Sequence, residues 1–312
     1  MNVIDGNSIA HANHNTTKLT VGDFEVQAIF GFLRSLRFIM RDTRADTQLV
    51  VLWDGRAQWR MDIYPEYKGN REALDAKQAA HKEAFKRQTP FIEKALSLLG
   101  ITQIRSPLLE ADDIAAHMVP AAAATRKVKL ITGDQDWLQL VHPNVTWFDP
   151  IRDRTVTHAT FFEHTGYVDP VTFGYGKALV GDNSDNVPGI PKMGDKTAQL
   201  FLAKWKSPQA FFDAVDAGTH KPATRKDPKA TSKHPEEFLA SPEGRDVYRR
   251  NYQLLSMLNA RRPAPGELVV NKGKFDREAF IKLCTRLNFA SILREQEQFF
   301  RDINLLPHTV AA

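Results

Sequence analysis

Nine carboxylate residues in the first 185 positions have the types and spacing needed to bind divalent cations. Several follow an apolar run typical of a buried strand: Asp5 follows Val3-Ile4, and Asp54 and Asp134 follow similar runs. Because the carboxyl ends of parallel strands meet at one edge of a sheet, we expect these acids to converge there. So many like charges in one cleft require nearby cations. The nine are Asp5, Asp54, Glu110, Asp112, Asp113, Asp134, Asp136, Asp182 and Asp185.

The ligand atoms of this set are all carboxylate oxygens. Oxygen ligands favour a hard cation, Mg²⁺ or Mn²⁺, over Zn²⁺. Two such ions about 4 Å apart would activate a water molecule and stabilise the leaving oxygen of a phosphodiester. Any one acidic cluster could instead be a helix cap or a turn. Three clusters together with two strand-terminal aspartates favour the metal site.

The charge balance indicates the kind of substrate. The chain has 312 residues and a formal net charge of +5, so an acidic cleft in a basic protein indicates a phosphate-rich polymer. The single cysteine, Cys284, excludes an internal disulfide and fits a reducing cytoplasm. With no run of 18 apolar residues, we expect no membrane span. Met1 lies so close to the first motif that we expect no cleaved leader.

A basic, aromatic segment follows the strand expected at 49–53. Tyr67 beside Lys68 and Arg71 suits a flipped base and its phosphate. Lys68 and Arg71 would share one helical face if a helix began near Lys68. The cations that follow either extend this positive surface or belong to an ordinary solvated helix. They are Lys77, His81, Lys82, Lys86 and Arg87.

Residues 189–198 predict a glycine-bounded turn that leads into a helix. Backbone N–H groups at that helix start can bind a phosphate, and Lys196 adds charge. Such contacts carry little base information, so we expect binding that is independent of sequence and sensitive to salt. Lys177 precedes Asp182 by five positions and either faces the same strand or is a surface lysine.

The first half of the chain alternates strand-like and helical patterns, which predicts a parallel sheet flanked by helices. Residues 56–88 interrupt this pattern; they are polar and become helical from about 70. After a boundary near 165–170 the chain is helical, with no clear strand until 268–270. The proline-containing basic segment 219–235 is expected to be mobile. The other expected elements are a strand ending near Asp5, helices at 22–42, 89–99 and 111–119, strands at 101–104 and 128–132, and a turn or helix at 136–141.

In this order the motifs resemble the 5′ nuclease superfamily, which includes flap endonucleases and the 5′→3′ exonuclease domain of bacterial DNA polymerase I. The small stand-alone bacteriophage 5′ nucleases look most similar. The matching segments are 3–8, 65–71, 110–113, 132–138, 181–186 and the turn at 189–198.

The resemblance implies an α/β fold: a PIN-like, mostly parallel sheet at 1–168 with a helical arch at about 64–100, and a helix–three-turn–helix DNA-binding domain at 169–312. It implies Mg²⁺-dependent hydrolysis at 5′ ends and 5′ flaps of double-stranded DNA, in replication or repair, by a cytoplasmic monomer of a bacterial or phage-infected cell. By the resemblance, the nine acids become the metal set. Asp134, Asp136, Lys68 and Arg71 become catalytic, and Tyr67 becomes a stacking residue. The implied DNA contacts are Lys177, Gly189, Lys192, Gly194, Lys196 and Thr197, and the turn at 189–194 would also hold K⁺.

Three features depart from the family pattern. Lys192 stands where relatives usually carry glycine, the 219–235 segment has no obvious counterpart, and no polymerase domain follows. Two other functions remain open. A non-catalytic junction binder would have lost some of the acids, and a PIN-type ribonuclease would usually lack the arch and the glycine-bounded turn.

Overall fold

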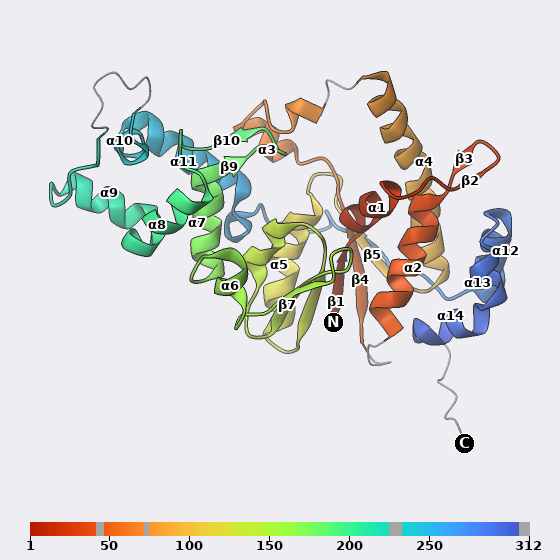
Figure 1. Ribbon diagram of the computed structural model, residues 1–312. Helices are drawn as coiled ribbons and strands as arrows, with labels where there is room; N and C mark the ends of the chain where they lie inside the picture. Colours follow the sequence, from red (N-terminus) through yellow and green to blue (C-terminus); the bar gives the residue numbers. More distant parts are fainter. Residues whose placement is uncertain (42–46, 72–74, 225–232, 306–312) are drawn as a thin grey trace.

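A mostly parallel β-sheet forms the centre of the molecule, as expected for the α/β class (Figure 1). The computed structural model describes residues 1–41, 47–71, 75–224 and 233–305, and within them the sheet has seven strands in the order β11-β5-β4-β1-β6-β7-β8. Neighbours from β5 to β7 are parallel, while β8 and β11 pair antiparallel at the two edges. The strands are β1 (Asn2–Asp5), β4 (Leu49–Trp53), β5 (Thr102–Arg105), β6 (Val128–Ile131), β7 (Val145–Asp149), β8 (Arg154–Val156) and β11 (Val269–Asn271).

Alternating side chains of the central strands divide the core into two layers. In β1, Val3 packs in one layer and Ile4 in the other, and in β4 Leu52 and Val51 divide in the same way. Burial on both faces explains why these strands read as continuous apolar runs. The Ile4 layer includes α1 (Gly6–His14), α2 (Gln27–Arg41) and α4 (Ala76–Leu98), and the Val3 layer includes α5 (Ala111–Ala123), η2 (Gln135–Leu140) and α7 (Pro170–Val180).

The end of the chain returns to the sheet, which corrects the predicted second domain at 169–312. Strand β11 lies where a strand was expected near 268–270, but it pairs with β5, with Val270 opposite Ile104. Phe280 and Phe300 then enter the core layer that contains Ile4. Sequence patterns could not reveal this pairing because it joins segments more than 160 residues apart. The returning helices are α12 (Arg277–Arg286), α13 (Ala290–Arg294) and α14 (Gln296–Asp302).

Between the sheet strands β8 and β11 the described chain is mainly helical, as expected. Part of the predicted basic segment at 219–235, residues 225–232, lies outside the described residues. No helix in the described part of the chain is long and apolar enough to cross a membrane. The elements are α6 (Phe161–Thr165), β9 (Gly181–Asp182), β10 (Val187–Pro188), α8 (Asp195–Trp205), α9 (Pro208–Asp216), α10 (Pro235–Ala240), α11 (Pro242–Leu255) and η3 (Met257–Asn259).

The segment from 56 to 99 differs most from the sequence prediction. Instead of a helix from about 70 and another at 89–99, one helix, α4, runs through Pro90. It begins at Ala76 because Asp75 and Gln78 form a capping box. Before it come α3 (Gln58–Ile63) and the short helix η1 (Gly69–Arg71). The helix expected at 22–42 starts at Gln27, after a hairpin of β2 (Thr20–Val21) and β3 (Phe24–Glu25).

Candidate active site

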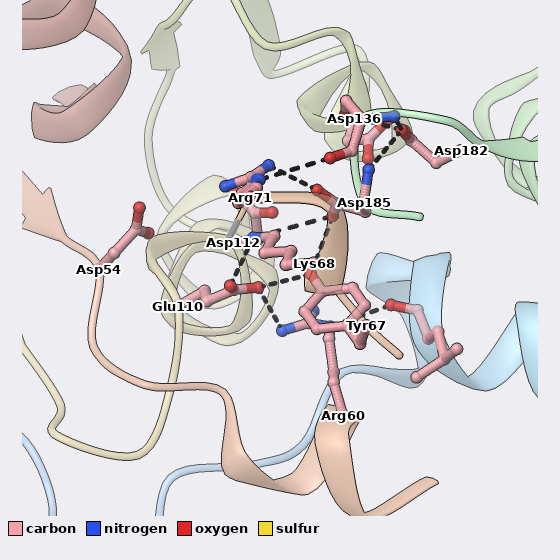
Figure 2. Close-up of polar contacts among 12 residues, drawn as sticks. Asp54, Arg60, Tyr67, Lys68, Arg71, Glu110, Asp112, Asp136, Asp182 and Asp185 are labelled. Carbon is pink, nitrogen blue, oxygen red and sulfur yellow. Dashed lines mark hydrogen bonds and ion pairs between the residues drawn. The ribbon is translucent and has the colours of Figure 1, made fainter. Parts of the chain in front are cut away.

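A cleft of about 430 Å³ lies at the carboxyl ends of the central strands. Eight of the nine predicted acids line it, from segments that are up to 180 residues apart, and Lys68 and Arg71 line it with them. Asp113 does not. The eight are Asp5, Asp54, Glu110, Asp112, Asp134, Asp136, Asp182 and Asp185. Figure 2 labels Lys68 and Arg71 together with Asp54, Glu110, Asp112, Asp136, Asp182 and Asp185.

Asp5 and Asp134 are fixed by the turns that follow β1 and β6. Asp5 accepts hydrogen bonds from the Ser8 N–H at 2.9 Å and from the Thr132 hydroxyl at 2.9 Å. The Gly133 N–H donates to the Ser8 hydroxyl at 3.0 Å, and the Asp134 N–H donates to Thr132 Oγ1 at 2.9 Å. These bonds join the two strand ends, so the two acids are held beside each other.

Two adjacent aspartates at the start of α5, Asp112 and Asp113, point in different directions. Asp112 lines the cleft and accepts a 2.6 Å hydrogen bond from Trp137 Nε1. Asp113 is fully buried beside Arg60, with 2.8 Å between Asp113 Oδ1 and Arg60 Nη2, and it also accepts from the Glu110 N–H at 3.0 Å. The prediction that Asp113 joins the other acids in the cleft is therefore wrong, because its carboxylate caps the helix and pairs with an internal arginine.

Arg60 is the central residue that the sequence analysis missed. It is buried, and besides Asp113 it contacts Glu110 Oε2 at 2.8 Å and donates to the Leu254 carbonyl at 3.0 Å. It thus links the acids to α11. Little in the sequence indicates this role, since Arg60 lies in the polar stretch 56–88.

The structure also places Tyr67 differently from the prediction of a stacking residue. Its side chain is only 4% exposed, and its hydroxyl donates to Glu110 Oε2 at 3.0 Å and Asp185 Oδ2 at 2.9 Å. Burial raises the pKa of the phenol, and Glu110 raises it further, so the hydroxyl stays a donor. Tyr67 therefore positions two cleft acids and offers no open face to a base.

Lys68 and Arg71 reach the cleft through a turn. Lys68 has a φ of 57°, and its N–H donates to the Asp185 carbonyl at 2.9 Å, so Lys68 lies outside the short helix η1, which begins at Gly69. The Lys68 ammonium lies 2.5 Å from Glu110 Oε1, and Arg71 Nη2 lies 2.7 Å from Asp185 Oδ1 (Figure 2). Both cations are thus directed at the acids, although they do not share a helical face.

Lys177 points toward the acids, which does not fit its predicted contact with duplex DNA. Its ammonium lies 2.8 Å from Asp136 Oδ1 and 2.8 Å from Asp182 Oδ2, and its side chain is 21% exposed. Burial opposes ionisation of Asp182, but Lys177 outweighs burial and lowers the pKa of that carboxyl to about 2. Lys177 is therefore the counter-ion of this acid pair.

Among the described residues, Asp5, Asp112 and Asp134 have no such counter-ion. Burial, followed by Asp54, raises the pKa of Asp5 to about 7, and burial, followed by Asp136, raises that of Asp134 to about 8. Burial and Asp134 also hold the pKa of Asp112 well above its usual range. Hard divalent cations would relieve this repulsion, and carboxylate oxygens are their preferred ligands. Among the described residues, however, no three acids already converge into a closed metal-binding group.

The turn at 189–198 lies outside the lining of the cleft. Lys192, Lys196 and Thr197 are exposed, and Gly194 is the N-cap of α8. Lys192 has a φ of 64°, so the backbone keeps the left-handed conformation usual for glycine. At Gly189 a β-carbon would lie 2.0 Å from the Val180 carbonyl oxygen, so the close turn requires glycine there.

Other residues that line the cleft were not predicted. Gly6, which follows Asp5, does not line the cleft, but only glycine fits there, because a β-carbon would lie 2.6 Å from the Trp53 ring. The first motif could have indicated Asn7 and Ser8, whereas the β7–β8 turn carries no recognisable pattern. The unpredicted lining residues are Asn7, Ser8, His11, Ala12, Gly133, Asp149, Ile151, Arg152 and Ser184.

Comparisons with known proteins show which sequences and folds this chain is similar to. A sequence model described as "5'-3' exonuclease, N-terminal resolvase-like domain" matches residues 1–166. The chain is 34% identical to a 5'-3' exonuclease of Aquifex aeolicus over 209 residues, which cover 66% of this chain and 69% of that protein. It is also 34% identical over 226 residues to DNA polymerase I of Mycobacterium tuberculosis, and this match covers 69% of the chain but only 24% of the polymerase.

Among solved structures, the bacteriophage T5 flap endonuclease in a complex with DNA and metal ions has a TM-score of 0.67 to this chain. The two share 18% sequence identity, and the match covers 97% of this chain and 98% of the phage protein. This likeness shows that the fold is shared over nearly the whole chain, including the part beyond residue 166.

Proposed function

The chain belongs to the 5′-3′ exonuclease family, and from this membership we propose that it is a structure-specific 5′ nuclease acting on DNA. The observation that carries the proposal is the convergence of eight acids, Lys68 and Arg71 on one cleft at the strand ends. The substrate is double-stranded DNA with a 5′ end or a 5′ single-stranded flap, and the biological context is replication or repair. We also propose that it acts as a monomer.

The acids lining the cleft fit Mg²⁺, with Mn²⁺ as a substitute. Asp5, Asp112 and Asp134 would hold one part of the metal set, because burial and mutual repulsion raise their pKa values. Asp136, Asp182 and Asp185 would hold the other part, since Asp136 and Asp182 share the Lys177 ammonium. Bound divalent cations would supply an activated water molecule and stabilise the leaving oxygen of the phosphodiester. Asp113 is left out of this proposed set.

Lys68 and Arg71 would contact the scissile phosphate from the arch side. Burial disfavours the charged form of Lys68, but Glu110 outweighs burial and raises its pKa, so the ammonium stays protonated. The planar guanidinium of Arg71 can bind two phosphate oxygens at once. Together they would stabilise negative charge that develops on the phosphate during hydrolysis.

The helical part after residue 168 would hold the DNA duplex. The exposed Lys192, Lys196 and Thr197 flank the start of α8, where free N–H groups attract a phosphate. We place the helix–three-turn–helix motif here, with K⁺ bound by the carbonyls of the turn at 189–194. Strand β11 pairs with the central sheet and the helices after it pack against that sheet, so this DNA-binding part would end before residue 269.

A 5′-flap DNA labelled at each end in turn tests the proposal. With Mg²⁺ the chain should release short 5′-phosphorylated products, and their lengths separate exonuclease from flap cleavage. Asp134→Asn and Asp182→Asn should abolish cleavage while flap binding remains measurable. As a matched control, Asp246→Asn changes an exposed acid of α11 and should cleave normally.

Two outcomes would overturn the proposal. Normal Mg²⁺-dependent turnover in both Asp134→Asn and Asp182→Asn would show that the cleft acids are not needed for cleavage. Preferential cleavage of a matched RNA flap over the DNA flap would instead favour a ribonuclease of the same fold.

A further inference from the structure

The turn between β7 and β8 adds an arginine to the cleft that the proposed function does not use. Asp149, at the end of β7, and Ile151 and Arg152 of this turn line the cleft. The buried Asp149 carboxylate accepts hydrogen bonds from the N–H groups of Ile151 at 2.9 Å and Arg152 at 3.2 Å. It also accepts from Arg152 Nη1 at 2.9 Å. One buried carboxylate therefore fixes both the turn and the direction of the guanidinium.

The Arg152 guanidinium lies over the turn that leads to Asp134. Its Nη1 is 3.8 Å from the position that a β-carbon would occupy at Gly133, an ordinary van der Waals distance that places the guanidinium beside this glycine. The Arg152 side chain is 59% exposed, and among the described residues it donates to Asp149 alone. Because a guanidinium has five N–H donors, most of them remain available to a ligand in the cleft.

Stability alone gives little reason for this arrangement. An ion pair with an exposed partner contributes little to the free energy of unfolding. An arginine that is oriented by a buried carboxylate is instead well prepared to bind a phosphate, because little side-chain freedom is lost on binding. Lys68 and Arg71 enter the same cleft from another segment, so Arg152 provides a separate cationic contact.

We propose that Arg152, held by Asp149, binds a backbone phosphate adjacent to the scissile phosphate. The inference rests on the proposed nuclease function, and it assigns a substrate contact to a turn that carries no sequence motif. Arg152 would contribute to substrate binding, whereas the cleft acids, Lys68 and Arg71 would contribute to hydrolysis.

The test compares Arg152→Gln with Arg152→Lys, and with Arg154→Gln as a matched control. Arg154 lies on β8, is exposed and does not line the cleft. Binding of 5′-flap DNA is measured by fluorescence anisotropy in EDTA over a range of salt. We expect Arg152→Gln to bind about tenfold more weakly, with a salt slope lower by roughly 0.9. Arg152→Lys should recover part of the loss, and Arg154→Gln should match the wild type.

Single neutral methylphosphonate linkages in the flap substrate locate the contact. At one position next to the cleavage site, the neutral linkage should weaken binding by the wild type and leave binding by Arg152→Gln unchanged. In Mg²⁺ and with unmodified flap DNA, the KM of Arg152→Gln should be about tenfold higher than that of the wild type, with kcat nearly unchanged. Thermal melting checks that each variant is folded.

Failure of this inference differs from failure of the proposed function. If the wild type cleaves flaps and Arg152→Gln binds and cleaves like Arg154→Gln, Arg152 is no phosphate ligand. The inference also fails if every neutral linkage weakens both proteins equally. If the wild type cleaves no DNA, the proposed function is wrong.

Discussion

The Lys177 ammonium lies 2.8 Å from a carboxylate oxygen of Asp136, which ties α7 to the acids that follow β6. The same ammonium lies 2.8 Å from Asp182, at the end of α7. One partly buried cation therefore sets the spacing of two acids from different motifs. This relationship makes Lys177 the partner of two cleft acids and gives it consequences for stability.

Lys177→Met should destabilise the protein in EDTA. The change leaves Asp136 and Asp182 without their counter-ion, at an expected cost of about 1–3 kcal/mol once the partial exposure of Lys177 is considered. Lys177→Arg, the control that keeps the charge, should lose less. Chemical denaturation measures the difference. Equal stability of Lys177→Met and the wild type would show that the lysine does not balance these acids.

The stability of the metal-free protein should fall as pH rises from about 7 to about 8.5. Asp5 and Asp134 have folded pKa values of about 7 and about 8, so the folded state keeps protons that the unfolded chain has already released. Asp134→Asn should therefore flatten this slope and raise the melting temperature at about pH 8 by a few degrees. Mg²⁺ should stabilise the wild type more at the higher pH.

Thermal melts in EDTA and in Mg²⁺ across this window measure the effect. Burial lowers the pKa of His11 to about 4 from its usual value of 6.5. The titration of His11 therefore changes stability only below about pH 6.5, outside this pH window. A melting temperature in EDTA that is constant or rises with pH would contradict the raised carboxyl pKa values.

The sequence predicted the sheet and most of the cleft because both depend on local patterns. Apolar runs marked β1, β4 and β6, and the acids at their ends necessarily met at one edge of the sheet. What it missed depends on contacts between distant segments. Arg60 reads as a surface residue until its donation to Leu254 shows that α3 and α11 enclose it. A strand was predicted where β11 lies, but its pairing with β5, which returns the chain to the sheet, was not.

The directions in which neighbouring side chains point could not be predicted from the sequence either. Asp112 and Asp113 belong to one motif and look equivalent, but adjacent helical residues point about 100° apart. The same limit applies to Tyr67, whose neighbour Lys68 adopts a left-handed backbone that no helical pattern would suggest.

Tyr67→Phe distinguishes a positioning role from a stacking role. If the ring stacked on a base, phenylalanine would preserve function. Because the hydroxyl donates to Glu110 and Asp185, we expect its loss to cost about 1–3 kcal/mol of stability. Cleavage should also weaken, since both acids lose a donor that orients them. Denaturation and flap cleavage are measured side by side, with Tyr64→Phe, a partly exposed tyrosine of the same segment, as the control. Full stability and activity of Tyr67→Phe would contradict the positioning role.

Asp112→Asn and Asp113→Asn should have opposite effects, although the two acids are adjacent. Asp112 faces a repulsive cleft, so its neutralisation should raise stability in EDTA and abolish metal-dependent cleavage. Asp113 balances the buried Arg60, so its neutralisation should cost about 2–4 kcal/mol of stability. The folded fraction of Asp113→Asn should still cleave, because Asp113 does not line the cleft. Unfolding curves in EDTA, paired with cleavage rates well below each melting temperature, separate the two. Loss of cleavage in a fully folded Asp113→Asn would return this residue to the metal set.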